Sequence, residues 1–185
     1  MASDRTTRAP GVTGSAAITI ATPLGWVCAV SRAGRLVAVS LPSETRDRAL
    51  AACGAEDFGE RGDAVLEALL VDLQRYFAGE PIDLGRHPVD LSGQPAFHRR
   101  ALLAARGISY GEVRTYGWLA AAAGRPRAAR AAGHAMSRNP IALVIPCHRV
   151  VAADGGLGGF GGGLEMKRAL LALEGVQING RRVRR

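Results

Sequence analysis

The sequence predicts an α+β fold in which a small N-terminal antiparallel sheet with a helix precedes a mostly helical C-terminal domain with a helix-turn-helix. Three observations predict it. Short β-prone runs open the chain, a long amphipathic helix follows, and glycine and proline divide the second half into short helical segments. The 185 residues are 48% hydrophobic, which is enough for a core. No segment approaches the ~20 apolar residues of a membrane span, so no membrane partner is expected.

The first domain begins with three β-prone runs, at residues 16–20, 26–30 and 36–41. The turn-forming segments Pro-Leu-Gly and Arg-Ala-Gly-Arg separate them, which predicts a three-stranded meander. Residues 1–15 carry Arg, Ser, Thr, Pro and Gly without an apolar run. We therefore expect a disordered N-terminus rather than a secretory signal.

A helix is predicted after the meander. Asp63 is a suitable N-cap, and Gly79 and Pro81 stop the helix. Between them, apolar residues recur at helical spacing: Val65, Leu66, Leu69, Leu70, Leu73 and Phe77.

The polar, Pro/Gly-punctuated stretch 82–93 is the expected connection between two domains. It places an N-terminal α/β domain at residues 16–91 and a second domain at 92–176. Residues 177–185 contain four arginines and are expected to form a basic C-terminal tail.

The second half reads as successive helices. A helix over 95–105 ends near Gly107, and a short connector over 110–114 follows. Thr115 can cap a helix over 116–123, which Gly124 breaks. Pro126 suits the first turn of the next helix, which reaches about residue 137. Two helices joined by a short glycine-containing turn are typical of a helix-turn-helix.

Charge is divided unevenly along the chain. Residues 1–96 carry a net charge of −3, and residues 97–185 carry +11. A polyanionic partner, first of all DNA or RNA, is the natural interpretation. The three cysteines form no CxxC pair and no Cys/His cluster with zinc spacing. We therefore expect reduced thiols, a cytoplasmic location and no metal.

The helix after Pro126 is nearly bare of large side chains. Its alanines would allow close approach to a groove, and Arg127 and Arg130 among its arginines could neutralise phosphate or insert between bases. An ordinary alanine-rich helix with solvated arginines is an equally good reading of this composition. With little beyond Arg to read base edges, any DNA binding should be independent of sequence.

The run Ile145-Pro146-Cys147-His148-Arg149-Val150 carries the chemistry. A thiol stands between a stiff proline and an imidazole, at the end of an apolar stretch expected to be a core strand. Neighbouring His or Arg lowers the pKa of a thiol and favours the nucleophilic thiolate. Side chains alternate in a strand, so Cys147 and His148 can cooperate only through a turn or a bridging water. The alternative is an inert buried cysteine.

Several motifs occur together in one order: Arg130, Asn139-Pro140, the Pro-Cys-His-Arg run and the glycine run 158–163. Together they resemble the O6-alkylguanine-DNA alkyltransferases, or methylated-DNA–protein-cysteine methyltransferases. The resemblance is strong from about residue 97 to 175. It is weaker in the first half, where residues 22–25 and 73–79 are similar to that family's N-terminal domain. It implies a ribonuclease-H-like first domain and a DNA-binding, catalytic second domain.

The resemblance also implies residue roles. Cys147 would accept an alkyl group from guanine O6 in a direct displacement, once per molecule and without a cofactor. His148 would act through a water as the base, Glu174 would orient the imidazole, and Asn139 would hold the turn before the active-site strand. From spacing alone, Glu174 could equally be a solvated residue at a helix end.

The partner implied is double-stranded DNA that contains O6-alkylguanine, with O4-alkylthymine as an alternative substrate and with the damaged nucleotide turned out of the helix. Arg130 would fill the vacated place, and Tyr116 would help rotate the phosphate and donate a hydrogen bond to the departing base. Without the resemblance, Tyr116 would pass for a core aromatic. We expect a monomer. The candidate DNA-contacting residues are Arg130, Tyr116, Arg127, Ala128, Ala129, Arg149, Gly158, Phe160 and Gly161.

The chain departs from the family pattern at a few positions. Phe160 and Gly161 stand where many members have Tyr and some have Ser, and Leu102 stands where Trp is common. Arg32 falls where some relatives have a zinc-binding cysteine. Competing interpretations are a non-repairing damage-sensing relative, a helix-turn-helix regulator and a Cys-His hydrolase. The first normally lacks the nucleophile, and the other two leave parts of the pattern without a role.

Overall fold

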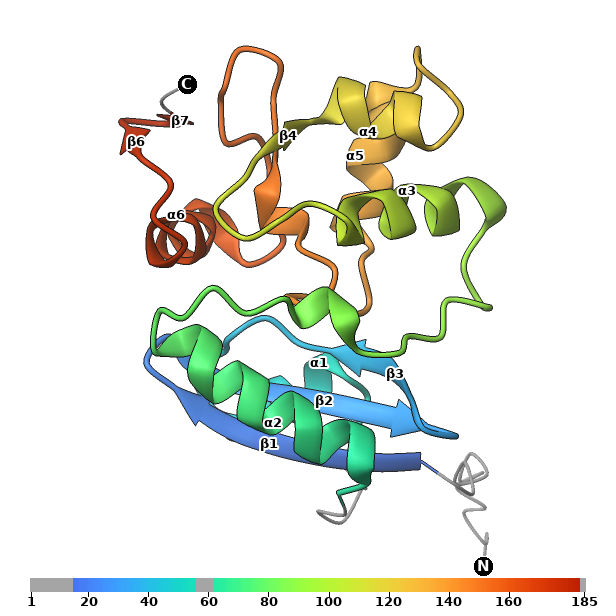
Figure 1. Ribbon diagram of the computed structural model, residues 1–185, viewed down its shortest axis with the longest axis vertical. Helices are drawn as coiled ribbons and strands as arrows, with labels where there is room; N and C mark the ends of the chain where they lie inside the picture. Colours follow the sequence, from blue (N-terminus) through green and yellow to red (C-terminus); the bar gives the residue numbers. More distant parts are fainter. Residues whose placement is uncertain (1–14, 56–61, 184–185) are drawn as a thin grey trace, which may run out of the picture.

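The computed structural model describes residues 15–55 and 62–183 and places a sheet layer beneath a group of helices (Figure 1). Three antiparallel strands form the sheet: β1 (Ser15–Thr22), β2 (Gly25–Arg32) and β3 (Arg35–Val39), in the order β1-β2-β3. The predicted meander is confirmed, with β1 and β2 longer than expected. The predicted disordered N-terminus falls on residues 1–14, outside the described residues, and on Ser15, which begins β1.

Helices cover both faces of this sheet (Figure 1). The predicted helix is α2 (Ala64–Phe77), which packs in one hydrophobic cluster with Val27 and Ala29 of β2. On the other face, α1 (Arg46–Ala52) packs with the alternate residues of β2, such as Cys28. Successive side chains of a strand point to opposite faces, so a central strand covered on both sides is apolar over the covered part, here residues 26–30. The sequence analysis did not predict α1, which has only seven residues.

The second half begins with η1 (Leu84–Arg86) and α3 (Ala96–Arg106), followed by β4 (Arg114–Thr115) and α4 (Tyr116–Ala122). Thr115 caps α4 as expected, because its hydroxyl accepts the Trp118 amide. Next come α5 (Ala129–Ser137), η2 (Cys147–Arg149), β5 (Val150–Val151), α6 (Gly163–Leu173), β6 (Ile178–Asn179) and β7 (Arg182–Val183).

The helix expected to start at Pro126 starts later. A separate turn, closed by the Ala128 amide on the Arg125 carbonyl, occupies the segment before α5. The helix itself begins at Ala129, so proline is outside its first turn. Helices α4 and α5 nevertheless pack against each other, and residues 123–128 connect them.

The stretch 141–145, expected to be a strand, is a compact buried turn. Leu143 has a left-handed φ of 67°, and Ala142 forms a bridge with Ile145. The stretch also adds to the edge of the N-terminal sheet. The Val39 amide donates to the Pro140 carbonyl, and the Ala142 amide donates to the Val39 carbonyl, both at 2.9 Å. The C-terminal half is thereby joined to β3 by backbone hydrogen bonds.

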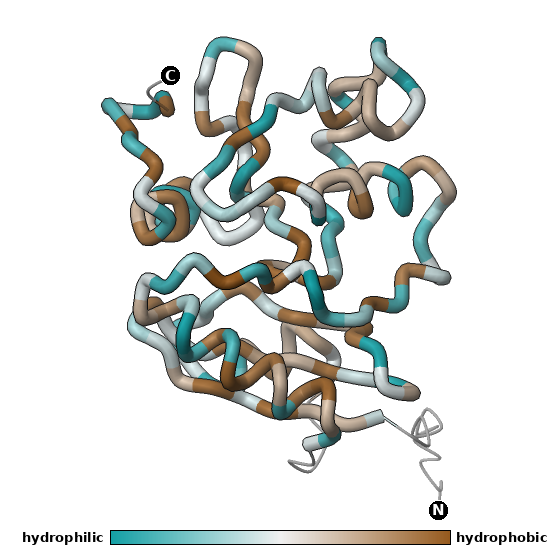
Figure 2. The backbone as a smooth tube through the Cα atoms, viewed as in Figure 1, coloured by the Kyte–Doolittle hydropathy of each residue, from teal (hydrophilic) through white to brown (hydrophobic). Residues whose placement is uncertain are grey.

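The largest hydrophobic cluster runs through both halves of the molecule. It includes α2 residues such as Leu69 together with Leu102, Leu119 and Ile145 from the second half. In Figure 2, α2 alternates between hydrophobic and hydrophilic residues along its turns, as expected for a helix with one buried face. Residues on both sides of the predicted boundary between residues 91 and 92 therefore share one hydrophobic core.

The segment predicted as a basic tail forms a hairpin as far as it is described. Strands β6 and β7 pair with each other, and β7 pairs with Gly156 through Arg182. The Val183 amide also donates to the Gly155 carbonyl at 2.9 Å. Within residues 15–55 and 62–183, no helix is both long and apolar enough to cross a membrane.

Asp63 stabilises α2 at its first turn. Its Oδ1 accepts the Leu66 amide at 3.0 Å, and its Oδ2 accepts the Ser31 hydroxyl at 2.6 Å. We expect Asp63→Ala to lower the free energy of unfolding by about 1–2 kcal/mol, the usual effect of losing an N-cap. Denaturant unfolding measures it. Asp63→Asn keeps the cap acceptor and should lose less, and equal losses would contradict the capping role.

Candidate active site

Cys147 and His148 lie in a tight turn and not in a strand. The 3-10 turn η2 is closed by the Arg149 amide on the Pro146 carbonyl at 3.0 Å. With three residues per turn, successive side chains point about 120° apart, whereas in a strand they would be opposed. Cys147 therefore lines a cavity while His148 and Arg149 point into the protein.

Glu174 lies behind the turn at the C-terminus of α6 and is buried. Its Oε1 accepts three hydrogen bonds: from His148 Nε2 at 2.8 Å, Tyr76 Oη at 2.7 Å and Arg149 Nη2 at 2.9 Å. Its Oε2 accepts Arg149 Nε at 2.8 Å and the Gly111 amide at 3.1 Å. The carboxylate thus has donors from three separate parts of the chain: α2, the segment at Gly111 and η2. The predicted contact between Glu174 and the imidazole is present.

These contacts keep Glu174 ionised. Burial by itself would raise the pKa of Glu174, but the hydrogen bonds and charges of His148 and Arg149 outweigh burial and lower it to about 2. An ionised carboxylate only accepts, so His148 Nε2 carries the proton in this bond and Nδ1 is left as an acceptor. Among the described residues, Nδ1 has no hydrogen-bond partner and is buried. Burial lowers the pKa of His148, which favours its neutral form.

The surroundings of Cys147 have opposing effects on the pKa of its thiol. Burial raises the pKa of Cys147, while a hydrogen bond from Asn139 and the nearby Lys167 charge lower it. Lys167 is itself buried, and burial lowers its pKa to about 8. Its ammonium donates to the carbonyls of Val150 and Leu157, each at 2.5 Å.

Asn139 holds the buried turn that precedes Cys147. Its Nδ2 donates to the Ile145 carbonyl at 2.8 Å, and its Oδ1 accepts the Ile141 amide at 3.1 Å. One amide side chain thereby spans both ends of the stretch 141–145. The sequence analysis expected Asn139 to hold a turn before a strand, and the structure shows it bonded to both ends of the stretch expected to be that strand.

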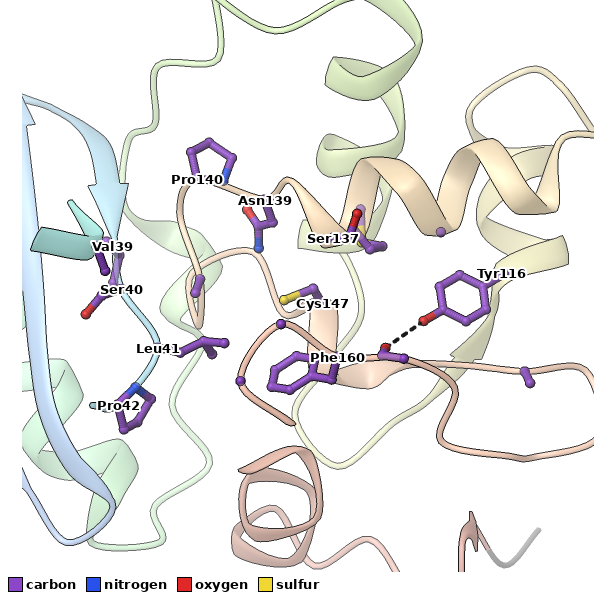
Figure 3. Close-up of a pocket in the computed structure, with 18 of the residues that line it drawn as sticks. Val39, Ser40, Leu41, Pro42, Tyr116, Ser137, Asn139, Pro140, Cys147 and Phe160 are labelled. Atoms are coloured by element: carbon purple, nitrogen blue, oxygen red, sulfur yellow. Dashed lines mark hydrogen bonds between the residues drawn. The ribbon is translucent and has the colours of Figure 1, made fainter. Parts of the chain in front are cut away.

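Cys147 opens into a cavity of about 1020 Å³ between the two halves of the molecule. Figure 3 shows its sulfur between Asn139 and Phe160, with Leu41 and Pro42 of the N-terminal half on the facing wall. Other predicted site residues also line it: Tyr116, Ala129, Arg130 and Gly161. The cavity is large enough for a nucleobase and its substituent.

Tyr116 and the glycine run meet at one side of this cavity (Figure 3). The Tyr116 hydroxyl donates to the Gly159 carbonyl at 3.5 Å. Gly158 has a left-handed φ of 67°, and a Cβ there would lie only 3.2 Å from the tyrosine ring. Glycine at 158 is therefore needed both for the backbone shape and for the approach of the ring.

The remaining candidates are divided between surface and interior. Arg127 and Arg130 are exposed near the start of α5, and Ala128 is half-buried beside them. Arg149 is only 5% exposed, and its guanidinium is used by Glu174 and by the Ile108 carbonyl at 2.6 Å. The Arg149 guanidinium is therefore not exposed for contact with DNA, contrary to the expectation from the sequence.

Sequence reasoning missed Tyr76 and Lys167. Both lie on the apolar stripe of a helix. Tyr76 continues the row of Leu69 and Leu73, and Lys167 stands between Leu164 and Leu171. A Tyr or Lys on the apolar stripe of a helix predicts a buried polar atom, and a buried polar atom needs a hydrogen-bond partner. This pattern could have identified both residues from the sequence.

Comparisons with known proteins point to one family. A family model described as the DNA binding domain of 6-O-methylguanine DNA methyltransferase matches residues 96–176. A methylated-DNA–protein-cysteine methyltransferase of Mycolicibacterium paratuberculosis is 52% identical over 102 residues. That stretch covers 55% of this chain and 61% of the relative, so the match spans less than two thirds of the relative's length.

Solved structures extend the likeness to the N-terminal half. The crystal structure of Mycobacterium tuberculosis O6-methylguanine methyltransferase matches with a TM-score of 0.71 and 36% identity, over 86% of this chain and 92% of that one. The Mycobacterium tuberculosis OGT structure in complex with DNA matches with a TM-score of 0.70 and 37% identity, over 85% and 91%. Because the similarity covers nearly all of these relatives, the chain belongs to the methylated-DNA–protein-cysteine methyltransferase family.

Proposed function

We propose that this protein is a methylated-DNA–protein-cysteine S-methyltransferase that repairs O6-alkylguanine in double-stranded DNA. It transfers the alkyl group irreversibly to its own Cys147, once per molecule. The observation that carries the proposal is a cysteine facing a nucleobase-sized cavity with a buried His148–Glu174 pair behind it. A nucleophile, a base and a group that orients the base are the elements of nucleophilic catalysis.

The displacement proceeds in one step. The Cys147 thiolate attacks the alkyl carbon, a carbon–sulfur bond forms, and the bond from that carbon to guanine O6 breaks with its electron pair going to the guanine. The thiol proton passes through a water to His148 Nδ1, the unoccupied acceptor of the buried pair. Tyr116 donates a hydrogen bond to the departing base, which becomes guanine by taking a proton from water, and the proton held by His148 returns to the solvent. The thioether left on Cys147 is a stable bond, and among the described residues that line the cavity there is no second thiol to cleave it.

The substrate reaches the cavity by leaving the base stack. Arg130 is exposed on α5 and also lines the cavity, which supports a role in filling the vacated space and bordering the flipped base. Arg127, Ala128 and Ala129 lie next to Arg130 at the start of α5 and would contact the DNA backbone or groove. The glycine run with Phe160 and Gly161 would close over the base.

The assignment of parts follows from the site. Residues 92–176 would form the DNA-binding, catalytic domain, with residues 16–91 as a ribonuclease-H-like domain that supplies one wall of the cavity. Residues of one chain complete that cavity, which suits a monomer. Free cysteines suit a reducing compartment such as the cytoplasm.

Alkyl transfer predicts a specific covalent product. After incubation with a duplex that contains one O6-methylguanine, we expect peptide mass spectrometry to find one added methyl group on the peptide with Cys147. Cys147→Ser should remain unmodified while still binding the duplex. Damage-selective binding by the wild type without methyl transfer would instead make the protein a sensor of alkylated DNA.

Arg130 is expected to matter for base flipping and not for the displacement. Arg130→Ala should slow transfer from duplex DNA by roughly tenfold or more, because flipping costs a few kcal/mol that an inserted side chain partly offsets. Reaction with free O6-methylguanine should be nearly unchanged. Single-turnover kinetics on both substrates measure this. Equal losses on both would remove the insertion role.

Arg127 offers a matched control with the same charge and similar exposure, three residues from Arg130. We expect duplex affinity to fall linearly on a plot of log affinity against log salt concentration, as for phosphate neutralisation. Arg127→Ala should reduce that slope by about one and leave the rate after binding unchanged. A wild-type affinity that is insensitive to salt would contradict a backbone-directed interface.

A further inference from the structure

Tyr76 belongs to the N-terminal half but reaches the proposed catalytic residues. It lies on α2, and its side chain is completely buried. Its hydroxyl donates to Glu174 Oε1 at 2.7 Å, the oxygen that also accepts His148 Nε2 at 2.8 Å. The two residues that form the 2.7 Å bond are 98 positions apart in the sequence.

Packing fixes the direction of this hydroxyl. The Tyr76 ring makes edge-to-face contacts with Phe77, at 5.2 Å between ring centres, and with Tyr110, at 5.9 Å. Tyr110 has the same chemistry and a neighbouring position, but its hydroxyl donates to the Leu173 carbonyl at 2.8 Å and not to Glu174. The two tyrosines therefore differ in what they donate to.

A donor on Glu174 Oε1 affects how strongly that oxygen holds His148. A hydrogen bond to the charged form of a carboxylate stabilises that charge and makes the oxygen a weaker acceptor toward other partners. Burial raises the pKa of Tyr76, so this hydroxyl stays protonated. Tyr76 is thus a fixed neutral donor that competes with His148 for one oxygen.

We propose that Tyr76 is a positioning residue of the alkyl transfer, through which the N-terminal half holds Glu174 Oε1 in place and limits the basicity of His148. The kinetic consequence of this inference rests on the function proposed above. The arrangement itself rests on the contacts among Tyr76, Glu174 and His148 alone.

Other charged groups around His148 also act on its pKa. Glu174, at the end of α6, raises its pKa, whereas Arg149 of η2 and Lys167 of α6 lower it. Cys147 is adjacent in η2, and Tyr110 neighbours Glu174. In Tyr76→Phe all of these groups remain, and of the three donors to Glu174 Oε1 only the Tyr76 hydroxyl is lost. Because the imidazolium is then held more strongly by Glu174, the pKa of His148 should rise.

The first test is an NMR titration of the His148 ring in the free protein. We expect Tyr76→Phe to move its midpoint upward by roughly half a pH unit or more, the effect of one ordinary hydrogen bond. Tyr110→Phe is the matched control and should leave the midpoint in place while it lowers the melting temperature. No shift in Tyr76→Phe, or the same shift in both variants, would overturn the inference.

The second test is the pH dependence of single-turnover methyl transfer from a duplex. The neutral base is the active form, so the ascending limb should move to higher pH in Tyr76→Phe, with the loss in rate greatest at low pH. A uniform loss at every pH would mean a merely structural role and would overturn the inference. If the wild type transfers no methyl group, the proposed function fails, and the ring titration still decides whether Tyr76 acts on His148.

A third measurement needs no variant. The Tyr76 hydroxyl proton in the wild type should exchange slowly, and its chemical shift should follow the titration of His148, because both donors share one oxygen. A shift that is independent of His148 would overturn the inference even if Tyr76→Phe did not fold.

Discussion

The buried carboxylate of Glu174 is the interaction on which the rest of the structure depends. An ionised carboxylate inside a protein is costly unless donors surround it. Here the donors come from α2, from Gly111 in the connector and from the active-site turn η2. Removing this charge would leave Arg149 buried without its ion pair. The requirement to satisfy Glu174 therefore fixes how the N-terminal half, the connector and the turn carrying Cys147 are placed relative to one another.

The same arrangement explains how Cys147, the proposed alkyl acceptor, can remain a thiol in the folded protein. Burial raises the pKa of Cys147 and keeps it as a thiol, which is less reactive than the thiolate. Asn139 and Lys167 act against burial, so the thiolate is stabilised when the proton is taken up nearby. Lys167 also donates to the carbonyls of Val150 and Leu157 on either side of the loop that follows η2. One ammonium group thus both lowers the pKa of Cys147 and holds the loop that follows η2.

The sequence predicts the elements that local signals define, and it fails where distant partners decide. The helices α2 and α4 are predicted because Asp63 and Thr115 mark their first turns. By contrast, the stretch 141–145 has the composition of a strand but folds as a turn, since Asn139 spans both of its ends. Arg149 looked like a surface cation beside Cys147. Its burial follows from a carboxylate 25 residues away, which no local pattern reveals.

Cys147 and His148 are adjacent in the sequence, and their proposed roles require a backbone conformation other than the expected strand. Cys147 and His148 could not share a face of a strand, and a helix-like turn of three residues per turn separates their directions without opposing them. The Cys147 side chain then lines the cavity, and the His148 side chain donates a hydrogen bond to Glu174. A residue inserted within 147–149 would rotate His148 away from the carboxylate while Cys147 kept its place. The chemistry of the site thus requires the length of this turn as strictly as it requires the identity of its residues.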